Sequence, residues 1–274
     1  MAELVDDADL AAFQRDGAVC VRGLFDAGEM ARVTAIVGAM LEHPSPRAKT
    51  ASRPGEPAFV EDFCNWSDHP ALLDLLRTSA IAPVAGALMG SETVRLYHDH
   101  VLAKEPGAQQ PTPWHQDQPY YNIDGRQNVS AWIPIDPVER ATTLEFVAGS
   151  HHGTWYLPTS FLAEEAHWFP PGSLEPVPDV DGGRDRYEVI GWELEPGDAV
   201  FFHMLTLHAA AGNSRTVPRR VLSLRFLGDD ITHAPRPWVT SPPFPGLAEQ
   251  LPAGAPMHHE LFPSLPATNA SAGA

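Results

Sequence analysis

The feature that most restricts the fold is a change of pattern near residue 93. Before it, apolar residues recur at helical spacing. After it, short segments rich in β-branched and aromatic residues alternate with Gly, Pro and Asp. The 28 Pro and 21 Gly fit a chain with many turns. We expect strands at 94–104, 129–135, 144–147, 188–194, 198–202 and 219–227. Helices followed by such strands predict a mainly β (α+β) protein with a double-stranded β-helix core, of the jelly-roll or cupin-like kind.

The part before residue 93 is expected to form helices that pack against one sheet. They are predicted at 7–15, 27–42, 71–78 and 81–89, with a strand at 18–21 and a loop at 43–57. Asp26 has the residue type and position of a helix N-cap. We predict a single domain over 1–274, with a helical part at about 1–90, the core at about 93–228 and a Pro-rich segment at 229–274. The long insertion at 153–187 is open to two interpretations, a lid over a substrate or a packed surface excursion.

The charge of the chain excludes some classes of partner. A net charge of −17 disfavours nucleic acid and anionic membranes as partners. Cys20 and Cys64 have no metal-site spacing and predict no disulfide framework. No apolar run approaches the ~20 residues that span a bilayer, and no signal peptide is expected. We therefore expect a cytoplasmic protein that acts on a small molecule, and no feature of the sequence predicts its oligomeric state.

A metal site is suggested by the segment Thr112–Gln118. It contains His115 and Asp117, and side chains two apart on an extended strand point to the same side. One imidazole and one carboxylate can then reach the same ion. A second histidine would complete the facial triad typical of non-haem Fe(II) enzymes, which leaves three positions open.

Two histidines further along could supply that third ligand. His203 and His208 are five residues apart, so on one regular strand they would face opposite sides. We expect His208 to bind the metal, because it precedes a small-residue turn at Gly212–Asn213 and is followed eleven residues later by Arg219. His203 is interpreted as a half-buried strand histidine.

Arg219 and its neighbour Arg220 should point to opposite faces of one strand, so one should be inside and the other in solvent. A guanidinium inside a barrel suits a carboxylate ligand, which it can bind through two hydrogen bonds. An alternative metal site remains open at His98 and His100, which share a strand face as cupin ligands do.

Taken together, these segments resemble the phytanoyl-CoA dioxygenase-like family of Fe(II)/2-oxoglutarate-dependent oxygenases. The resemblance covers roughly residues 7 to 228. It is carried, in order, by Phe13–Gly17, Val21–Phe25, Trp114–Asp117, Ala131–Ile133, Phe146–His151, Gly197–Asp198, His208, Asn213 and Arg219. It implies that Fe(II) is bound by His115, Asp117 and His208. It also implies that Arg219 holds the distal carboxylate of 2-oxoglutarate and that Trp132 lines the same pocket.

The reaction implied by this resemblance is the hydroxylation of an aliphatic C–H bond by O2, with release of succinate and CO2. We expect the substrate to be a small metabolite or a secondary-metabolite intermediate. Asp117 favours hydroxylation, because related halogenases lack this carboxylate. Candidate substrate residues are Tyr120, Tyr121, Phe63 and Trp66, for which plain aromatic packing is the alternative. Two other functions stay open: a cupin-type metalloenzyme, either an isomerase or a dioxygenase without 2-oxoglutarate, and a non-catalytic jelly-roll binding protein.

Overall fold

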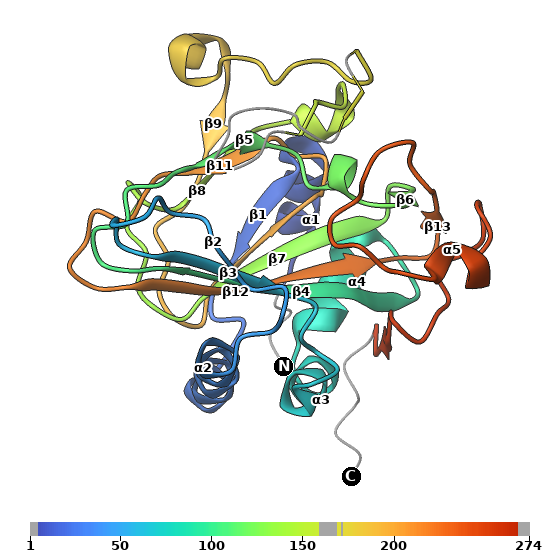
Figure 1. The fold of residues 1–274 in the computed structure, drawn as a ribbon, viewed down its shortest axis with the longest axis horizontal. Helices are drawn as coiled ribbons and strands as arrows, with labels where there is room; N and C mark the ends of the chain where they lie inside the picture. Colours follow the sequence, from blue (N-terminus) through green and yellow to red (C-terminus); the bar gives the residue numbers. More distant parts are fainter. Residues whose placement is uncertain (1–4, 159–168, 171, 268–274) are drawn as a thin grey trace.

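Two antiparallel sheets face each other in this computed structural model, which describes residues 5–158, 169–170 and 172–267 (Figure 1). The larger sheet has eight strands in the order β1–β10–β7–β12–β4–β3–β2, with β14 also paired to β4. The smaller sheet has the order β5–β11–β8–β9, and β13 and β6 form a separate pair. The expected mainly β, jelly-roll fold with helices on one sheet is confirmed.

The elements follow one another along the chain in this order: α1 (Asp7–Asp16), β1 (Ala18–Val21), α2 (Ala27–Glu42), β2 (Lys49–Thr50), β3 (Phe59–Phe63), α3 (Pro70–Thr78), α4 (Ile81–Met89), β4 (Val94–Lys104), β5 (Thr112–His115), the 3-10 helix η1 (Gln118–Tyr120), β6 (Ile123–Asp124), β7 (Asn128–Pro134), β8 (Leu144–Val147), η2 (Ser150–His152), η3 (Asp181–Arg186), β9 (Val189–Ile190), β10 (Ala199–Phe202), β11 (His208–Ala210), β12 (Arg219–Leu227), β13 (Thr232–His233), α5 (Leu247–Gln250) and β14 (Ser264–Leu265).

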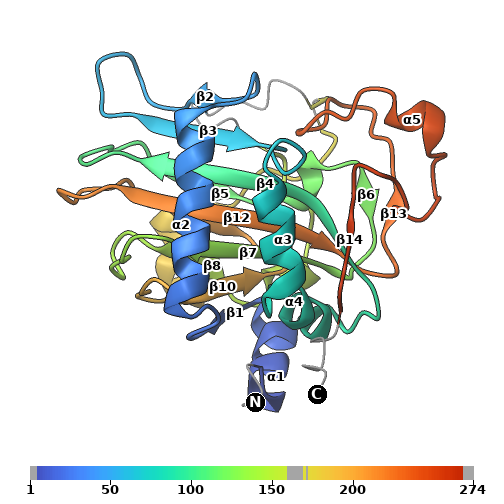
Figure 2. The same ribbon diagram turned by 90° about the horizontal axis from the view of Figure 1, so that it is seen from below.

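Helices α2 and α3 lie side by side across the outer face of the larger sheet (Figure 2). The N-cap predicted at Asp26 is confirmed: its side chain accepts from the Glu29 amide, and Glu29 bonds back to the Asp26 amide in a capping box. The apolar face of α2 is then buried against the sheet. Among the described residues no single helix is long and apolar enough to cross a membrane, and only the α3–α4 pair, bent by 63°, passes on length and composition.

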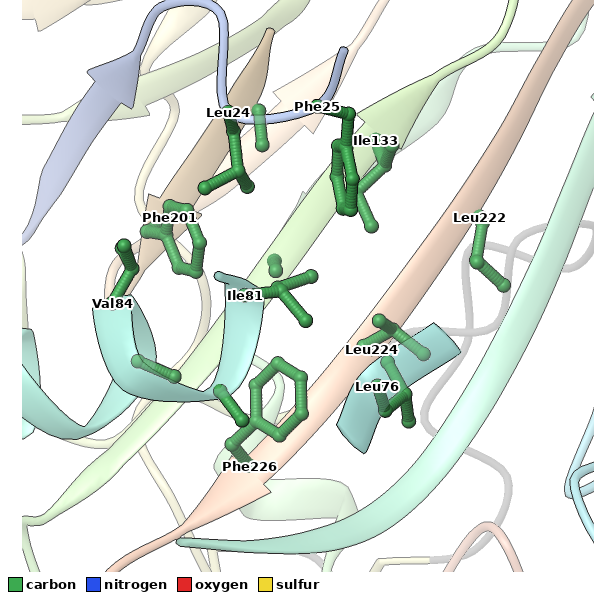
Figure 3. Packing of buried hydrophobic residues seen from close by; sticks show 14 of the residues in the cluster. Leu24, Phe25, Leu76, Ile81, Val84, Ile133, Phe201, Leu222, Leu224 and Phe226 are labelled. Carbon is green, nitrogen blue, oxygen red and sulfur yellow. The ribbon is translucent and has the colours of Figure 1, made fainter. Parts of the chain in front are cut away.

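Strand β12 illustrates how the larger sheet separates two environments. Leu222, Leu224 and Phe226 point outward into the core beneath the helices, where Figure 3 places them near Leu76 of α3 and Ile81 of α4. The alternate positions 219, 221, 223 and 225 point inward, into the space between the two sheets. One strand therefore carries the hydrophobic core on one face and the lining of a cavity on the other.

The predicted strands at 94–104, 144–147 and 219–227 are confirmed at both ends. The strand predicted at 188–194 was too long, because pairing with β8 ends after Ile190. Just after this point Gly191 packs closely against the Leu144 carbonyl. A Cβ atom added to Gly191 would lie only 2.7 Å from that oxygen.

The sequence prediction missed β3 and placed β2 within a loop. Both strands extend the larger sheet beyond β4, as the register Phe63↔His100 and Lys49↔Glu61 shows. With β1, the part before residue 93 contributes three strands to this sheet. The C-terminal segment contributes β14, so strands from all three predicted parts share one sheet.

Phe226 provides a test of the core between helices and sheet. The side chain is fully buried, so Phe226→Ala is expected to lower the free energy of unfolding by about 3–5 kcal/mol. Urea unfolding followed by circular dichroism measures this change. Val239→Ala is the control, because Val239 is 63% exposed and its removal should change the free energy little. A loss below about 1 kcal/mol for Phe226→Ala would contradict this account of the core.

Candidate metal centre

Three buried side chains converge between the two sheets. His115 ends β5, His208 begins β11, and the two residues are register partners across the smaller sheet. One carboxylate oxygen of Asp117, Oδ1, lies 3.7 Å from His115 Nε2 and 3.9 Å from His208 Nε2. In the described part of the chain this is the one group of three or more potential metal ligands whose atoms converge, all within 4.8 Å of one another.

Asp117 reaches this position by a different route from the one predicted. It does not share an extended strand with His115: β5 ends at His115, and Asp117 adopts right-handed helical backbone angles at the start of η1. The amides of Asp117 and Gln118 both donate to the carbonyl of Met204, at 2.8 and 2.9 Å. A turn held by Met204, and not strand alternation, therefore aims the carboxylate at the two imidazoles.

Backbone carbonyls set the orientation of both histidine rings. Nδ1 of His115 lies 2.8 Å from the Pro113 carbonyl, and Nδ1 of His208 lies 2.8 Å from the Thr206 carbonyl. Each Nδ1–H donates to its carbonyl, which leaves the lone pair of Nε2 directed at the centre. Burial, reinforced by His115, lowers the pKa of His208 to about 3, so this ring is neutral near pH 7. Neutral imidazole is the form that binds metal.

The second oxygen of Asp117 is held by two side chains from the larger sheet. Oδ2 accepts from Ser130 Oγ of β7 at 2.9 Å and forms a buried ion pair with Arg225 Nη2 of β12 at 3.1 Å. Burial would raise the pKa of Asp117, but the Arg225 guanidinium and the two imidazoles lower it below its usual range. The carboxylate is therefore ionised, with Oδ1 left to face the centre. Two nitrogens and one carboxylate oxygen, all on one side, fit a facial triad for Fe(II).

The triad opens into a cavity of about 420 Å³ lined by both sheets. Two buried basic side chains, Arg219 of β12 and Lys104 of β4, lie at its far end, on directly paired positions. Both donate to backbone carbonyls: Arg219 to Thr142 and Ala211, Lys104 to Gln110 and Ala211. Neither forms an ion pair with any described carboxylate. This pair can accept an anionic group.

Burial lowers the pKa of both side chains. It lowers the pKa of Arg219 to about 10. Burial and the neighbouring Arg219 lower the pKa of Lys104 to about 6. Arg220 points the other way and pairs with Asp136 at 2.6 Å, so the predicted division between an inner and an outer arginine is confirmed.

The other predicted site residues fall into two groups. Trp132, Tyr120, Tyr121 and Phe63 all line the cavity. Trp66 does not: it packs against the core beneath the helices, because the Asp99 carboxylate accepts from the Asn65 and Trp66 amides and turns this loop outward.

His203 stays outside the triad, as expected, but it is buried and not part of a strand, so the prediction of a half-buried strand histidine was wrong. It lies just beyond β10, with Nε2 3.0 Å from the Arg126 carbonyl. Of the 153–187 insertion, residues 159–168 and 171 lie outside the described residues, and its described part supplies no cavity-lining residue. The Pro-rich C-terminal segment does supply lining residues, Ser241 and Pro242.

Sequence reasoning missed three residues of this site: Ser130, Arg225 and Lys104. A signal existed for Arg225, since a lone charge within the apolar run Val221–Leu227 must find a buried partner if it faces inward. For Lys104 the signal was weaker, because a lysine at the end of a strand is usually solvated.

Comparisons with known proteins agree with this geometry. Residues 13–221 match the family described as phytanoyl-CoA dioxygenase (PhyH). A probable phytanoyl-CoA dioxygenase of Caenorhabditis elegans is 28% identical over 193 residues, 67% of this chain and 59% of that protein. A methylphosphonate hydroxylase of Gimesia maris is 26% identical over 187 residues, 67% of this chain and 62% of that protein. The chain thus matches about three fifths of the length of these relatives.

Solved structures are similar over nearly the whole chain. The epimerase SnoN of nogalamycin biosynthesis, solved in complex with Fe3+, alpha ketoglutarate and nogalamycin RO, aligns with a TM-score of 0.76 at 24% identity. The alignment covers 94% of this chain and 97% of that one.

The ion pair behind Asp117 can be tested through metal affinity. Replacing Arg225 by Met leaves the buried carboxylate without its cation, which raises its pKa and loosens its orientation. Fe(II) affinity is expected to fall about 10- to 100-fold. Anaerobic Fe(II) titration measures the affinity. Arg220→Met, on the opposite face of the same strand, is the matched control and should bind Fe(II) as the wild type does. Unchanged affinity in folded Arg225→Met protein would refute this role.

Proposed function

Because this chain belongs to the phytanoyl-CoA dioxygenase family, we propose that it is an Fe(II)- and 2-oxoglutarate-dependent oxygenase that hydroxylates an aliphatic C–H bond of a small molecule. The family resemblance read from the sequence is thereby confirmed. The enzyme class and the cofactors iron, 2-oxoglutarate and O2 are part of the proposal, which the buried triad supports. The observation that carries the proposal is a buried His-Asp-His triad in a cavity whose far end holds two buried cations.

The residues of this chain divide the work between them. His115, Asp117 and His208 would hold iron from one side and leave its cavity side open to ligands. Arg219 and Lys104 would hold the distal carboxylate of 2-oxoglutarate, with Trp132 as a wall of the same pocket. When bound, iron with 2-oxoglutarate and O2 supplies the oxidant for a C–H bond and releases succinate and CO2.

Asp117 supports hydroxylation over halogenation. The carboxylate occupies the third protein-ligand position and is locked there by Arg225 and Ser130. A halide would have to displace this buried, ion-paired side chain. The cavity supports a small substrate, because about 420 Å³ suits a compact ligand beside the cosubstrate. The name of one relative agrees with this, since it is a methylphosphonate hydroxylase.

An anaerobic spectrum tests the proposal directly. Adding Fe(II) and then 2-oxoglutarate to wild-type protein is expected to produce a weak metal-to-ligand charge-transfer band in the visible region. Asp117→Ala should abolish or much weaken the band, because the metal loses the one carboxylate ligand that the protein supplies. Arg219→Leu should require about 10- to 100-fold more 2-oxoglutarate, the cost of a lost charged hydrogen bond.

Arg220→Leu is the control for Arg219→Leu and should leave the titration unchanged. If wild-type protein binds Fe(II) but shows no band at any 2-oxoglutarate concentration, the oxygenase proposal fails. A cupin-type metalloenzyme that works without 2-oxoglutarate would then replace it.

Lys104 predicts a pH dependence of cosubstrate binding. Its pKa of about 6 makes the amine largely neutral at pH 8 in the free protein. A carboxylate beside it favours the charged form and raises that pKa. Binding of 2-oxoglutarate should therefore take up a proton, and affinity should fall as pH rises above 6, by at most about tenfold per unit.

Calorimetry in two buffers with different ionisation enthalpies measures this proton uptake. Lys104→Met should bind more weakly and with no uptake from this group. Wild-type binding without proton uptake at pH 8 would contradict the assignment of Lys104.

A further inference from the structure

The cavity has a second polar region, on the wall formed by β3 and β4. Strand alternation places Glu61 and Phe63 of β3, and His98 and His100 of β4, on its cavity face. None of these side chains belongs to the triad or to the pair of cations at the far end. The sequence had offered the two histidines as an alternative metal pair. In the described residues, however, the triad is the only convergent group of three or more potential ligands, and neither histidine belongs to it.

His98 presents a hydrogen-bond acceptor to the cavity. The ring is 3% exposed, and its Nδ1 lies 3.2 Å from the Asp99 carbonyl, to which it donates. Nε2 is therefore the atom with the lone pair, and it is buried with no hydrogen-bond partner in the described structure. Burial, with the Arg225 charge nearby, holds the pKa of His98 well below its usual value, so the ring is neutral.

Glu61 and His100 present an incomplete pair. Glu61 Oε2 lies 3.6 Å from His100 Nε2, too far for a direct hydrogen bond, and this Nε2 is also buried without a partner. Burial would raise the pKa of Glu61, but His100 and Lys49 lower it, so the carboxylate is ionised. A hydroxyl group beside the pair, within reach of both atoms, could accept from His100 and donate to Glu61.

We propose that His98, His100 and Glu61 form the substrate-recognition wall, and that this wall selects a neutral substrate carrying neighbouring hydroxyl groups. The inference rests on the proposed oxygenase function and names the substrate class for the same cavity. Two acceptors, His98 Nε2 and the Glu61 carboxylate, require donors from the ligand. The ring of Phe63, edge-on to His100 at 5.6 Å, offers apolar surface to the carbon skeleton.

The charges around this wall disfavour ionic substrates. A carboxylate or phosphate would be repelled by Glu61. An ammonium group would meet the Lys49 amine, which stands 5.4 Å from the centre of the Phe63 ring, and the Arg225 guanidinium behind the triad. A hydroxyl group satisfies the acceptors without adding charge. Because a site built from buried polar groups strongly rejects analogues that leave them unpaired, this wall should set specificity.

The test uses three probes that share one six-membered carbon ring: cis-1,2-cyclohexanediol, cyclohexanol and cyclohexanecarboxylate. Binding to anaerobic protein carrying Fe(II) and 2-oxoglutarate is followed by the paramagnetic relaxation of the probe's protons, which reports proximity to the metal. Wild-type protein should bind the diol at least about tenfold more tightly than cyclohexanol, and the carboxylate more weakly than either.

Two variants separate recognition from general damage. Glu61→Gln should weaken diol binding by about tenfold. His98→Leu should weaken diol binding and strengthen cyclohexanol binding, which reverses the preference, an outcome that misfolding does not produce. Glu42→Gln, an exposed residue at the end of α2, is the matched control and should bind all probes as wild type does.

The charge-transfer band with 2-oxoglutarate is recorded for every variant. A variant that keeps the band but loses the preference for the diol supports the proposed role of the wall in substrate recognition. Equal binding of diol and cyclohexanol to wild-type protein, or an unchanged preference in both variants, overturns the inference and leaves the oxygenase proposal standing. Absence of the band in the wild type counts against the proposed function instead.

Discussion

The buried ion pair between Asp117 and Arg225 joins the two halves of this molecule. Asp117 belongs to the loop after β5 in the smaller sheet, and Arg225 to β12 at the centre of the larger one. A carboxylate buried without its cation costs several kcal/mol, so the two sheets must meet in one relative position for the pair to form. The same contact occupies one oxygen of Asp117 and leaves the other for the two imidazoles. Strand β12 begins at Arg219, six residues before Arg225. The two side chains face the same side of the sheet, about 20 Å apart along the strand. One strand thus sets both the metal end and the anion-binding end of the cavity.

The anion-binding end is unfavourable for the folded protein considered alone. Lys104 and Arg219 are two basic side chains on paired strand positions, both nearly inaccessible and both bonded to carbonyls. Burial and the Arg219 charge lower the pKa of Lys104, so the charged form of this amine is disfavoured in the folded protein. The other face of the same strands offsets it, where Leu222, Leu224 and Phe226 are completely buried against the helices. Stability comes mainly from the outer face of the larger sheet, which allows its inner face to hold groups chosen for binding.

The sequence predicted best what depends on local alternation. Strands β8 and β12 matched because each is rich in apolar residues and bounded by turn residues, and β4 matched because its apolar and polar residues alternate over much of its length before Pro106. Strand β3 was missed because five residues with two central carboxylates resemble a polar loop. The segment becomes a strand through its pairing with β4, which the sequence of β3 alone does not predict. His115 and Asp117 were paired correctly, but for the wrong geometric reason, since the carbonyl of Met204, almost ninety residues away, sets the turn. Long-range contacts of this kind produce no periodic pattern in the sequence. The same holds for Trp66, whose direction depends on the Asp99 carboxylate beneath it.

Two regions of the cavity differ in a way that determines which ligand each can bind. The end beside Arg219 and Lys104 offers basic side chains that form no ion pair with a carboxylate among the described residues. The wall formed by β3 and β4 offers His98 Nε2, an acceptor without a donor, and the ionised Glu61 carboxylate. A dianion such as 2-oxoglutarate is attracted to Arg219 and repelled by Glu61, whereas a neutral hydroxylated molecule gains little beside Arg219 and most beside His98 and Glu61. Because each buried unpaired polar group costs about 1–3 kcal/mol, exchanging the two ligands would leave polar groups unpaired in both regions. The triad faces the same cavity as both regions, so the charges that separate the two ligands would also place a substrate carbon and the cosubstrate on its open side.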